Sequence, residues 1–227
     1  MDAEAEAGED RAMILLPDAE RLWRMALALN RAAAAVSPHV AALPPLLFFT
    51  DPERTPRPWE TAARLPAGSG VVYRHFGDPA ALEVATRLRH ISEQTGTRLV
   101  IGADPDLADS VGADGVHLPQ RALEQSVAIR HARPGWIITG AVHAEGHLAA
   151  MSMAALDACV VSPVFQAGGA SGSKDPLGPD ALRTTLARLG RPAYALGGIT
   201  AGNAGGLKSS GACGLAGVDG IISAFGP

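Results

Sequence analysis

The chain has 227 residues, 47% of them hydrophobic, which is enough apolar material to bury the core of one α/β domain. Its net charge is −4 with a sequence pI near 6.0, and aromatic residues make up 4%, so it lacks the basic surface and stacking rings expected of a nucleic-acid-binding protein. No apolar run reaches the roughly 18 residues of a membrane span, and the first residues are acidic rather than basic. These features favour a cytoplasmic protein.

The N-terminal part of the chain divides into two segments. Residues 1–15 are acidic and rich in Ala and Gly, and we expect them to form a disordered tail. From Pro17 to about Val36, apolar residues recur at helical spacing with Glu and Arg between them, which predicts an amphipathic helix within residues 16–42.

From Leu46 onward, short apolar runs alternate eight times with helical stretches. Runs that are apolar on both faces are typical of parallel strands buried on both sides. The expected strands are Leu46–Thr50, Gly70–His75, Arg98–Gly102, Gly115–Leu118, Trp136–Val142, Ala158–Ser162, Ala193–Leu196 and Gly214–Gly217. The expected helices between and after them are Trp59–Leu65, Pro79–Thr95, Asp104–Val111, Leu123–Ala132, Glu145–Ala155, Pro179–Leu189, Asn203–Ser210 and Asp219–Ala224.

Eight β-then-α repeats predict a single (β/α)₈ TIM barrel over residues 43–227, with the extra N-terminal helix capping its bottom. An open doubly wound sheet would need a GxGxxG turn after its first strand, and the sequence from Asp51 to Pro56 does not supply one. In a barrel, chemistry belongs to the C-terminal ends of the strands. The candidates at these ends are Thr50, Arg74, His75, the loop after Gly102, His117, Gln120, His143, the loop from Ser162 to Lys174, Gly197, Gly198 and Asp219.

The glycines that follow the last two expected strands indicate a phosphate site. In (β/α)₈ barrels the loops after strands seven and eight commonly hold phosphate through backbone N–H groups, which side chains would block. We therefore assign Gly197, Gly198 and Gly217 to phosphate binding. In the alternative interpretation, Gly197 and Gly198 only let the strand turn sharply into its helix.

The two cysteines, Cys159 and Cys213, both lie inside apolar runs. This favours small buried thiols, and a metal pair or a disulfide is the alternative.

Four motifs occur in a specific order: Gly112-Ala-Asp-Gly-Val-His-Leu-Pro-Gln120, Ala141-Val-His143, Val161-Ser-Pro-Val-Phe165 with Pro176-Leu-Gly178, and Ala195-Leu-Gly-Gly-Ile-Thr200. Over roughly residues 45 to 225 the chain resembles the thiamine phosphate synthase family, which includes the thiazole tautomerases. The resemblance implies a (β/α)₈ barrel, in agreement with the strand count.

The family synthase is a transferase that joins a pyrimidine-methyl pyrophosphate to a thiazole phosphate carboxylate and releases pyrophosphate. Mg²⁺ and basic side chains hold the departing pyrophosphate. The resemblance therefore implies a role in thiamine biosynthesis, a Mg²⁺ cofactor and a phosphate-bearing heterocycle as ligand, with Arg74, His143 and Lys174 as catalytic candidates. A homodimer is left open.

Several family positions are substituted here. After strand two the family has Gln-x-Arg-x-Lys, and the matching residues are Val72, Arg74 and Phe76, so only the arginine is kept. At the two places where the family has acidic Mg²⁺ ligands, this chain has Ala103 and Ala122.

A slip of one residue in the comparison would bring Asp104 to the first ligand place. Asp104-Pro105 also has the pattern of a helix cap, and we favour the cap. We therefore expect no metal ligand in the chain, Asp104 excepted if the slip holds.

The phosphate-contacting lysine of the family matches Ala170, and Lys174 follows four residues later in a Gly/Ser-rich loop that could bring it over the barrel mouth. A solvated loop lysine is the alternative.

Ala141 replaces a family serine, whereas His143 is kept, either for proton transfer or as a histidine bonded to backbone. Asp219 stands where the family has a small residue, and we expect it to cap the last helix and to oppose phosphate.

Three functions remain open on the sequence alone. The first is a thiamine phosphate synthase whose substituted positions argue against full activity. The second is a metal-independent, tautomerase-like isomerase that uses His143, and the third is a non-catalytic barrel that binds a small molecule or a partner.

Overall fold

The computed structural model describes residues 17–142, 153–168 and 175–227. Within them, eight parallel strands pair in sequence order, and β8 pairs back to β1 to close the barrel. The strands are β1 Leu46–Phe49, β2 Gly70–Tyr73, β3 Arg98–Gly102, β4 Gly115–Leu118, β5 Ile137–Val142, β6 Ala158–Val161, β7 Ala193–Leu196 and β8 Gly214–Gly217. All eight expected strands are confirmed, with ends that differ by at most two residues.

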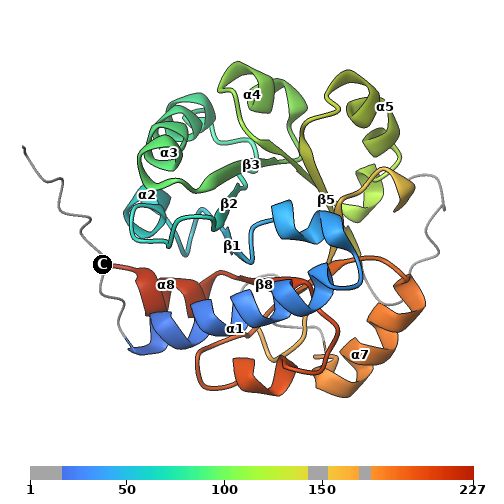
Figure 1. Cartoon of the computed structure of the whole chain (residues 1–227). Coiled ribbons are helices and arrows are strands. Elements are labelled where there is room, and N and C mark those ends of the chain that lie inside the picture. Colours follow the sequence, from blue (N-terminus) through green and yellow to red (C-terminus); the bar gives the residue numbers. More distant parts are fainter. Residues whose placement is uncertain (1–16, 143–152, 169–174) are drawn as a thin grey trace, which may run out of the picture.

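Helices surround the strands as a ring (Figure 1). The described helices are α1 Pro17–Ala34, η1 Pro38–Ala42, α2 Pro58–Ala62, α3 Ala81–Thr95, α4 Pro105–Ser110, η2 Gln120–Ala122, α5 Gln125–Ala132, α7 Gly178–Leu189, η4 Ala204–Leu207 and α8 Asp219–Phe225, of which the η elements are 3₁₀ helices.

Three expected helices differ from the structure. The one expected over Trp59–Leu65 is α2, which already ends at Ala62. The one expected over Leu123–Ala132 begins at Gln125, after the separate turn η2. The one expected over Asn203–Ser210 is only the short η4, because Gly205 and Gly206 have low helix propensity. Most of the helix expected over Glu145–Ala155 lies outside the described residues, as does the tail expected over residues 1–15.

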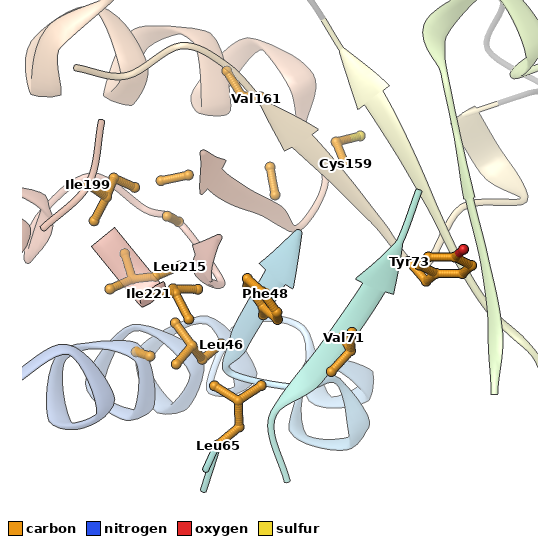
Figure 2. Packing of buried hydrophobic residues seen from close by; sticks show 14 of the residues in the cluster. Leu46, Phe48, Leu65, Val71, Tyr73, Cys159, Val161, Ile199, Leu215 and Ile221 are labelled. Atoms are coloured by element: carbon orange, nitrogen blue, oxygen red, sulfur yellow. The ribbon is translucent and has the colours of Figure 1, made fainter. Parts of the chain in front are cut away.

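The strands bury side chains on both faces, which explains their continuous apolar runs. One cluster fills the barrel interior and includes Phe49 and Tyr194, whose hydroxyl donates to the Pro44 carbonyl oxygen at 2.7 Å. The larger cluster lies between the strands and the helices. Figure 2 shows part of it, with Leu46 of β1 and Leu215 of β8 beside each other.

Helix α1 covers the bottom of the barrel only with its last turn, where Ala33 and Ala34 pack against the interior cluster, so that expectation holds for this turn alone. The helix packs on the outside against β8 and α8, as Figure 1 shows, because the seven-residue α8 is too short to cover this side and α1 brings a matching stripe of buried residues. The following turn η1 also places Val40 in the interior cluster. The Asn30 side chain of α1 fixes this turn by donating to the Val40 carbonyl oxygen at 3.1 Å.

Cys159 and Cys213 are both buried free thiols, as expected. Burial raises the pKa of the Cys159 thiol to about 11 and shifts the pKa of Cys213 in the same direction. None of the described helices has the length and apolar character needed to cross a membrane.

Candidate functional site

A cavity of about 220 Å³ opens at the C-terminal ends of β1, β2, β6, β7 and β8. In the part of the chain that the structure describes, its wall combines backbone from the glycine-rich loops with two arginines, one carboxylate and one aromatic ring. The lining residues include Phe49, Arg54, Arg74, Gly197, Gly198 and Asp219.

Gly197 and Gly198 form the turn after β7, with φ of +104° and +63°. A Cβ on Gly198 would stand 2.2 Å from the Gln166 carbonyl oxygen, and one on Gly197 would stand 2.9 Å from Pro163 Cα. Both conformation and space therefore require glycine. The backbone amides of these two residues donate to no acceptor in the described part of the chain, so they are available to a ligand.

Asn203 holds this turn in place, a role that sequence reasoning missed. Its Nδ2 donates to the Gly198 carbonyl oxygen at 2.8 Å, and its Oδ1 accepts from the Thr200 amide at 2.8 Å. The signal was an Asn three residues after Thr200, since Asn commonly bonds to nearby backbone in turns.

Gly217 lines the same cavity at the end of β8, as the phosphate-site hypothesis requires. A Cβ there would lie 3.4 Å from Ile221, which is ordinary contact, so this position does not demand glycine on steric grounds. Its contact with phosphate stays a prediction.

Arg74 follows β2 and is fixed by the end of β1. Its Nε donates to the Thr50 carbonyl oxygen at 2.7 Å, and its guanidinium carbon lies 5.4 Å from the ring centroids of both Phe49 and Phe76. Burial lowers the pKa of Arg74, whereas the nearby Asp51 carboxylate opposes this shift. An arginine remains charged even so, and the residue brings a fixed cation to the cavity.

Arg54, on the loop after β1, is the second cation in the cavity wall, and sequence reasoning missed it. Its guanidinium donates to Asp51 at 2.9 Å and to Asp219 at 3.0 Å. The hydrogen bond to Asp51 raises the pKa of Arg54, and the same bond lowers the pKa of Asp51. The available signal was position, because Arg54 comes soon after the C-terminal end of a barrel strand.

The expected cap role of Asp219 is wrong. Val218 occupies the N-cap position of α8, and Asp219 is the first helical residue, whose side chain pairs with Arg54. The reason is that the Arg54 cation, on the loop after the neighbouring strand β1, competes with backbone amides for the carboxylate, and charge-assisted bonds are the stronger ones.

Asp104 caps α4, as favoured from the sequence. Its Oδ1 accepts from the Leu107 amide at 2.9 Å, and its Oδ2 lies 3.2 Å from Nε2 of His75. The preceding Ala103 has φ of +61° and donates its amide to the His117 carbonyl oxygen at 2.9 Å.

At the two places where the resemblance implies acidic Mg²⁺ ligands, this chain has no carboxylate. Ala103 and Ala122 carry no side-chain oxygen, and Asp104 is engaged in the cap. In the residues that the structure describes, no group of three or more His, Cys, Asp or Glu side chains could hold a metal ion.

His117 lies inside the barrel rather than in the cavity wall. Its Nδ1 is 3.0 Å from Thr139 Oγ1, and its ring meets Phe49 edge to face at 5.0 Å. Burial, with a smaller contribution from the Arg74 charge, lowers the pKa of His117 to about 3. The imidazole is therefore neutral near pH 7 and is a poor acid there.

The remaining catalytic candidates, His143 and Lys174, lie outside the described residues. Of the predicted site, the structure brings Arg74, Gly197, Gly198 and Gly217 together around one cavity.

The fold and the cavity define a (β/α)₈-barrel protein with a ligand site at the C-terminal face, where barrels of this class bind their substrates. The chain matches the family model for "Thiamine monophosphate synthase" over residues 49–221, and it belongs to this family. The resemblance noted from the sequence is thus confirmed, and family membership connects the chain to thiamine biosynthesis.

Among similar proteins, the thiamine-phosphate synthase of Chlorobium luteolum is 30% identical over 84% of this chain and 90% of its own length. A thiamine biosynthesis bifunctional protein of Symbiobacterium thermophilum is 34% identical over 66% of this chain, a match that spans only 31% of that larger protein. The solved thiamine phosphate pyrophosphorylase of Pyrococcus furiosus shares the fold, with a TM-score of 0.64, 22% identity, and coverage of 80% of this chain and 91% of that one.

Proposed function

We propose that this protein binds a thiazole phosphate of thiamine biosynthesis in the cavity beside Gly197 and Gly198, and that it does not catalyse Mg²⁺-dependent coupling at the rate of an ordinary synthase. The observation that carries the proposal is the contrast between the two halves of the site. The backbone turn that suits a phosphate is kept, whereas the residues that suit a metal-bound pyrophosphate are replaced.

The binding half rests on donors that face one cavity. Within the described residues the amides of Gly197 and Gly198 donate to no acceptor, and Arg54 and Arg74 supply positive charge. Asp51 and Asp219 balance these two cations, so the site relies on oriented donors more than on net charge. Such a site holds a phosphate through hydrogen bonds to backbone amides, which are effective anion donors.

The catalytic half rests on the missing oxygen ligands. Mg²⁺ is usually bound by one or two carboxylates besides substrate phosphate, and Ala103 and Ala122 offer none. Each preorganised electrostatic contact to the developing charge is worth about 10²–10³ in rate. Loss of the metal contact and of a basic residue at Phe76 should therefore lower coupling by several orders of magnitude.

A metal-independent isomerase is the second candidate, favoured by the place of His143 in the chain. Strand β5 ends at Val142, so this histidine directly follows the C-terminal end of a barrel strand. Proton transfer by one histidine contributes about 10²–10⁴ in rate without a metal.

The test uses the purified protein with thiazole phosphate and pyrimidine pyrophosphate. We expect calorimetry to show thiazole phosphate binding that is unchanged by Mg²⁺ or by chelator, and a coupling assay to show at most a trace of product. Brisk coupling that requires Mg²⁺ would overturn the proposal and restore an ordinary synthase. Failure of thiazole phosphate to bind would remove its binding half.

A further inference from the structure

The carboxylate of Asp219 stands on the same rim as the glycine turn. Its neighbour Gly220 packs so closely on the Ile199 carbonyl oxygen that a Cβ would stand 1.9 Å from it. Asp219 Oδ2 accepts from Arg54 at 3.0 Å, and no donor from the described residues contacts Oδ1. The side chain is 57% exposed and lines the cavity, so Oδ1 can meet a ligand.

The described wall of the cavity therefore presents several donors and one anionic acceptor. Arg54 and the amides of Gly197 and Gly198 can donate to phosphate oxygens. A phosphate dianion has only acceptors, and one of its oxygens would face the Asp219 carboxylate without a proton between them. A singly protonated phosphate supplies that proton, because its P–OH group is a donor.

We infer that the cavity takes a phosphate monoester in its monoanionic form, with the P–OH donating to Asp219 while Arg54 and the two glycine amides donate to the other oxygens. This rests on the proposed function, since it assigns the protonation state of the same ligand. Asp219 then acts as a specificity residue that separates a protonated phosphate from anions that carry no proton.

Among the residues that the structure describes, the charged side chains lining the cavity leave the ligand as the group that titrates between pH 5 and 8. Arg54 faces it from the loop after β1, Arg74 from the loop after β2, and Asp219 from α8, while Asp51 pairs with both arginines without lining the cavity. Carboxyl and guanidinium groups ordinarily titrate outside pH 5 to 8. Below the cavity, burial keeps the pKa of His117 at about 3, which is also outside this range.

The size of the expected pH effect follows from the ligand. A phosphate monoester has a second pKa near 6, so its monoanion falls from about three quarters of the total at pH 5.5 to about 1% at pH 8. If only the monoanion binds, the dissociation constant of thiazole phosphate should rise by roughly 50-fold or more between these pH values.

The experiment is calorimetry of thiazole phosphate and of the corresponding sulfate ester at both pH values. The sulfate ester is a monoanion throughout and has no proton to donate, so it separates charge from hydrogen bonding. We expect the sulfate ester to bind at least tenfold more weakly than the phosphate at pH 5.5. In Asp219→Asn, the tighter binding at pH 5.5 than at pH 8 and the preference for the phosphate over the sulfate ester should both disappear. Asp180→Asn is the control, because it removes the same charge from a side chain on α7 that is 92% exposed, and it should keep both preferences.

Equal binding of thiazole phosphate at both pH values would refute this inference and leave phosphate binding intact. So would equal binding of the two esters at pH 5.5, or unchanged preferences in Asp219→Asn. Absence of thiazole phosphate binding at either pH in every variant would instead refute the proposed function, and the inference with it.

Discussion

Replacing Gly198 with Ala tests whether the glycine turn is required by the close approach of two loops. The new Cβ would lie 2.2 Å from the Gln166 carbonyl oxygen, at a residue whose φ is +63°. A left-handed conformation costs a non-glycine residue about 1–2 kcal/mol. Forcing an extra carbon into packed structure costs typically about 1–3 kcal/mol more.

The sum predicts that Gly198→Ala lowers the free energy of unfolding by about 2–5 kcal/mol. With a urea m-value of about 2–3 kcal/mol/M, the midpoint of unfolding should fall by roughly 1–2 M. Urea titration followed by circular dichroism measures this shift, and thiazole phosphate binding should be lost in the same variant because the loop must move.

Gly205→Ala is the matched control. Gly205 lies in η4 without a positive φ, and a Cβ there meets nothing within 4 Å. We expect this change to be neutral or to stabilise the protein by up to about 1 kcal/mol. A Gly198→Ala variant as stable as the Gly205→Ala variant would show that the turn relaxes freely and that the steric argument is wrong.

Three further predictions concern Asp104, His117 and His143. Asp104→Ala should remove the α4 cap and lower the free energy of unfolding by about 1 kcal/mol, without changing any Mg²⁺ dependence of thiazole phosphate binding. A loss of Mg²⁺-dependent binding in this variant would identify Asp104 as a metal ligand. The pKa of His117 is about 3 in the folded protein and near 6.5 in the unfolded chain, so between these pH values the unfolded chain binds one more proton. The free energy of unfolding should therefore be largest above pH 6.5 and fall as the pH drops toward 3. His117→Gln should make the acid side of the stability–pH curve less steep, by up to about 1.4 kcal/mol per pH unit, and an unchanged slope would contradict this assignment. His143→Ala should lower the rate of any thiazole tautomerisation by a factor of about 10²–10⁴. An unchanged tautomerisation rate in this variant would exclude His143 as the proton-transfer group.

Much of the barrel follows from local sequence. Strand β6, for example, is buried on both faces, so its sequence is an uninterrupted apolar run whichever strands it pairs with. Eight such runs, each followed by a helical stretch, have few ways to satisfy their backbone groups other than a closed parallel sheet. The glycine turn at Gly197 and Gly198 was likewise predictable, because their positive φ angles are a local property of the chain.

Other features depend on residues that only the closed barrel brings together. Arg54 and Asp219 are 165 residues apart in sequence and pair because β8 closes onto β1, which makes the loops after these two strands neighbours. The sequence around Asp219 alone fits a cap, and no local pattern reveals the competing cation. Similarly, α1 shows its apolar stripe in the sequence, but its place beside β8 depends on the short α8 that leaves this side open. The local sequence pattern determines which faces of each element must be buried. Closure of the barrel decides which distant charges pair and which surfaces cover those faces.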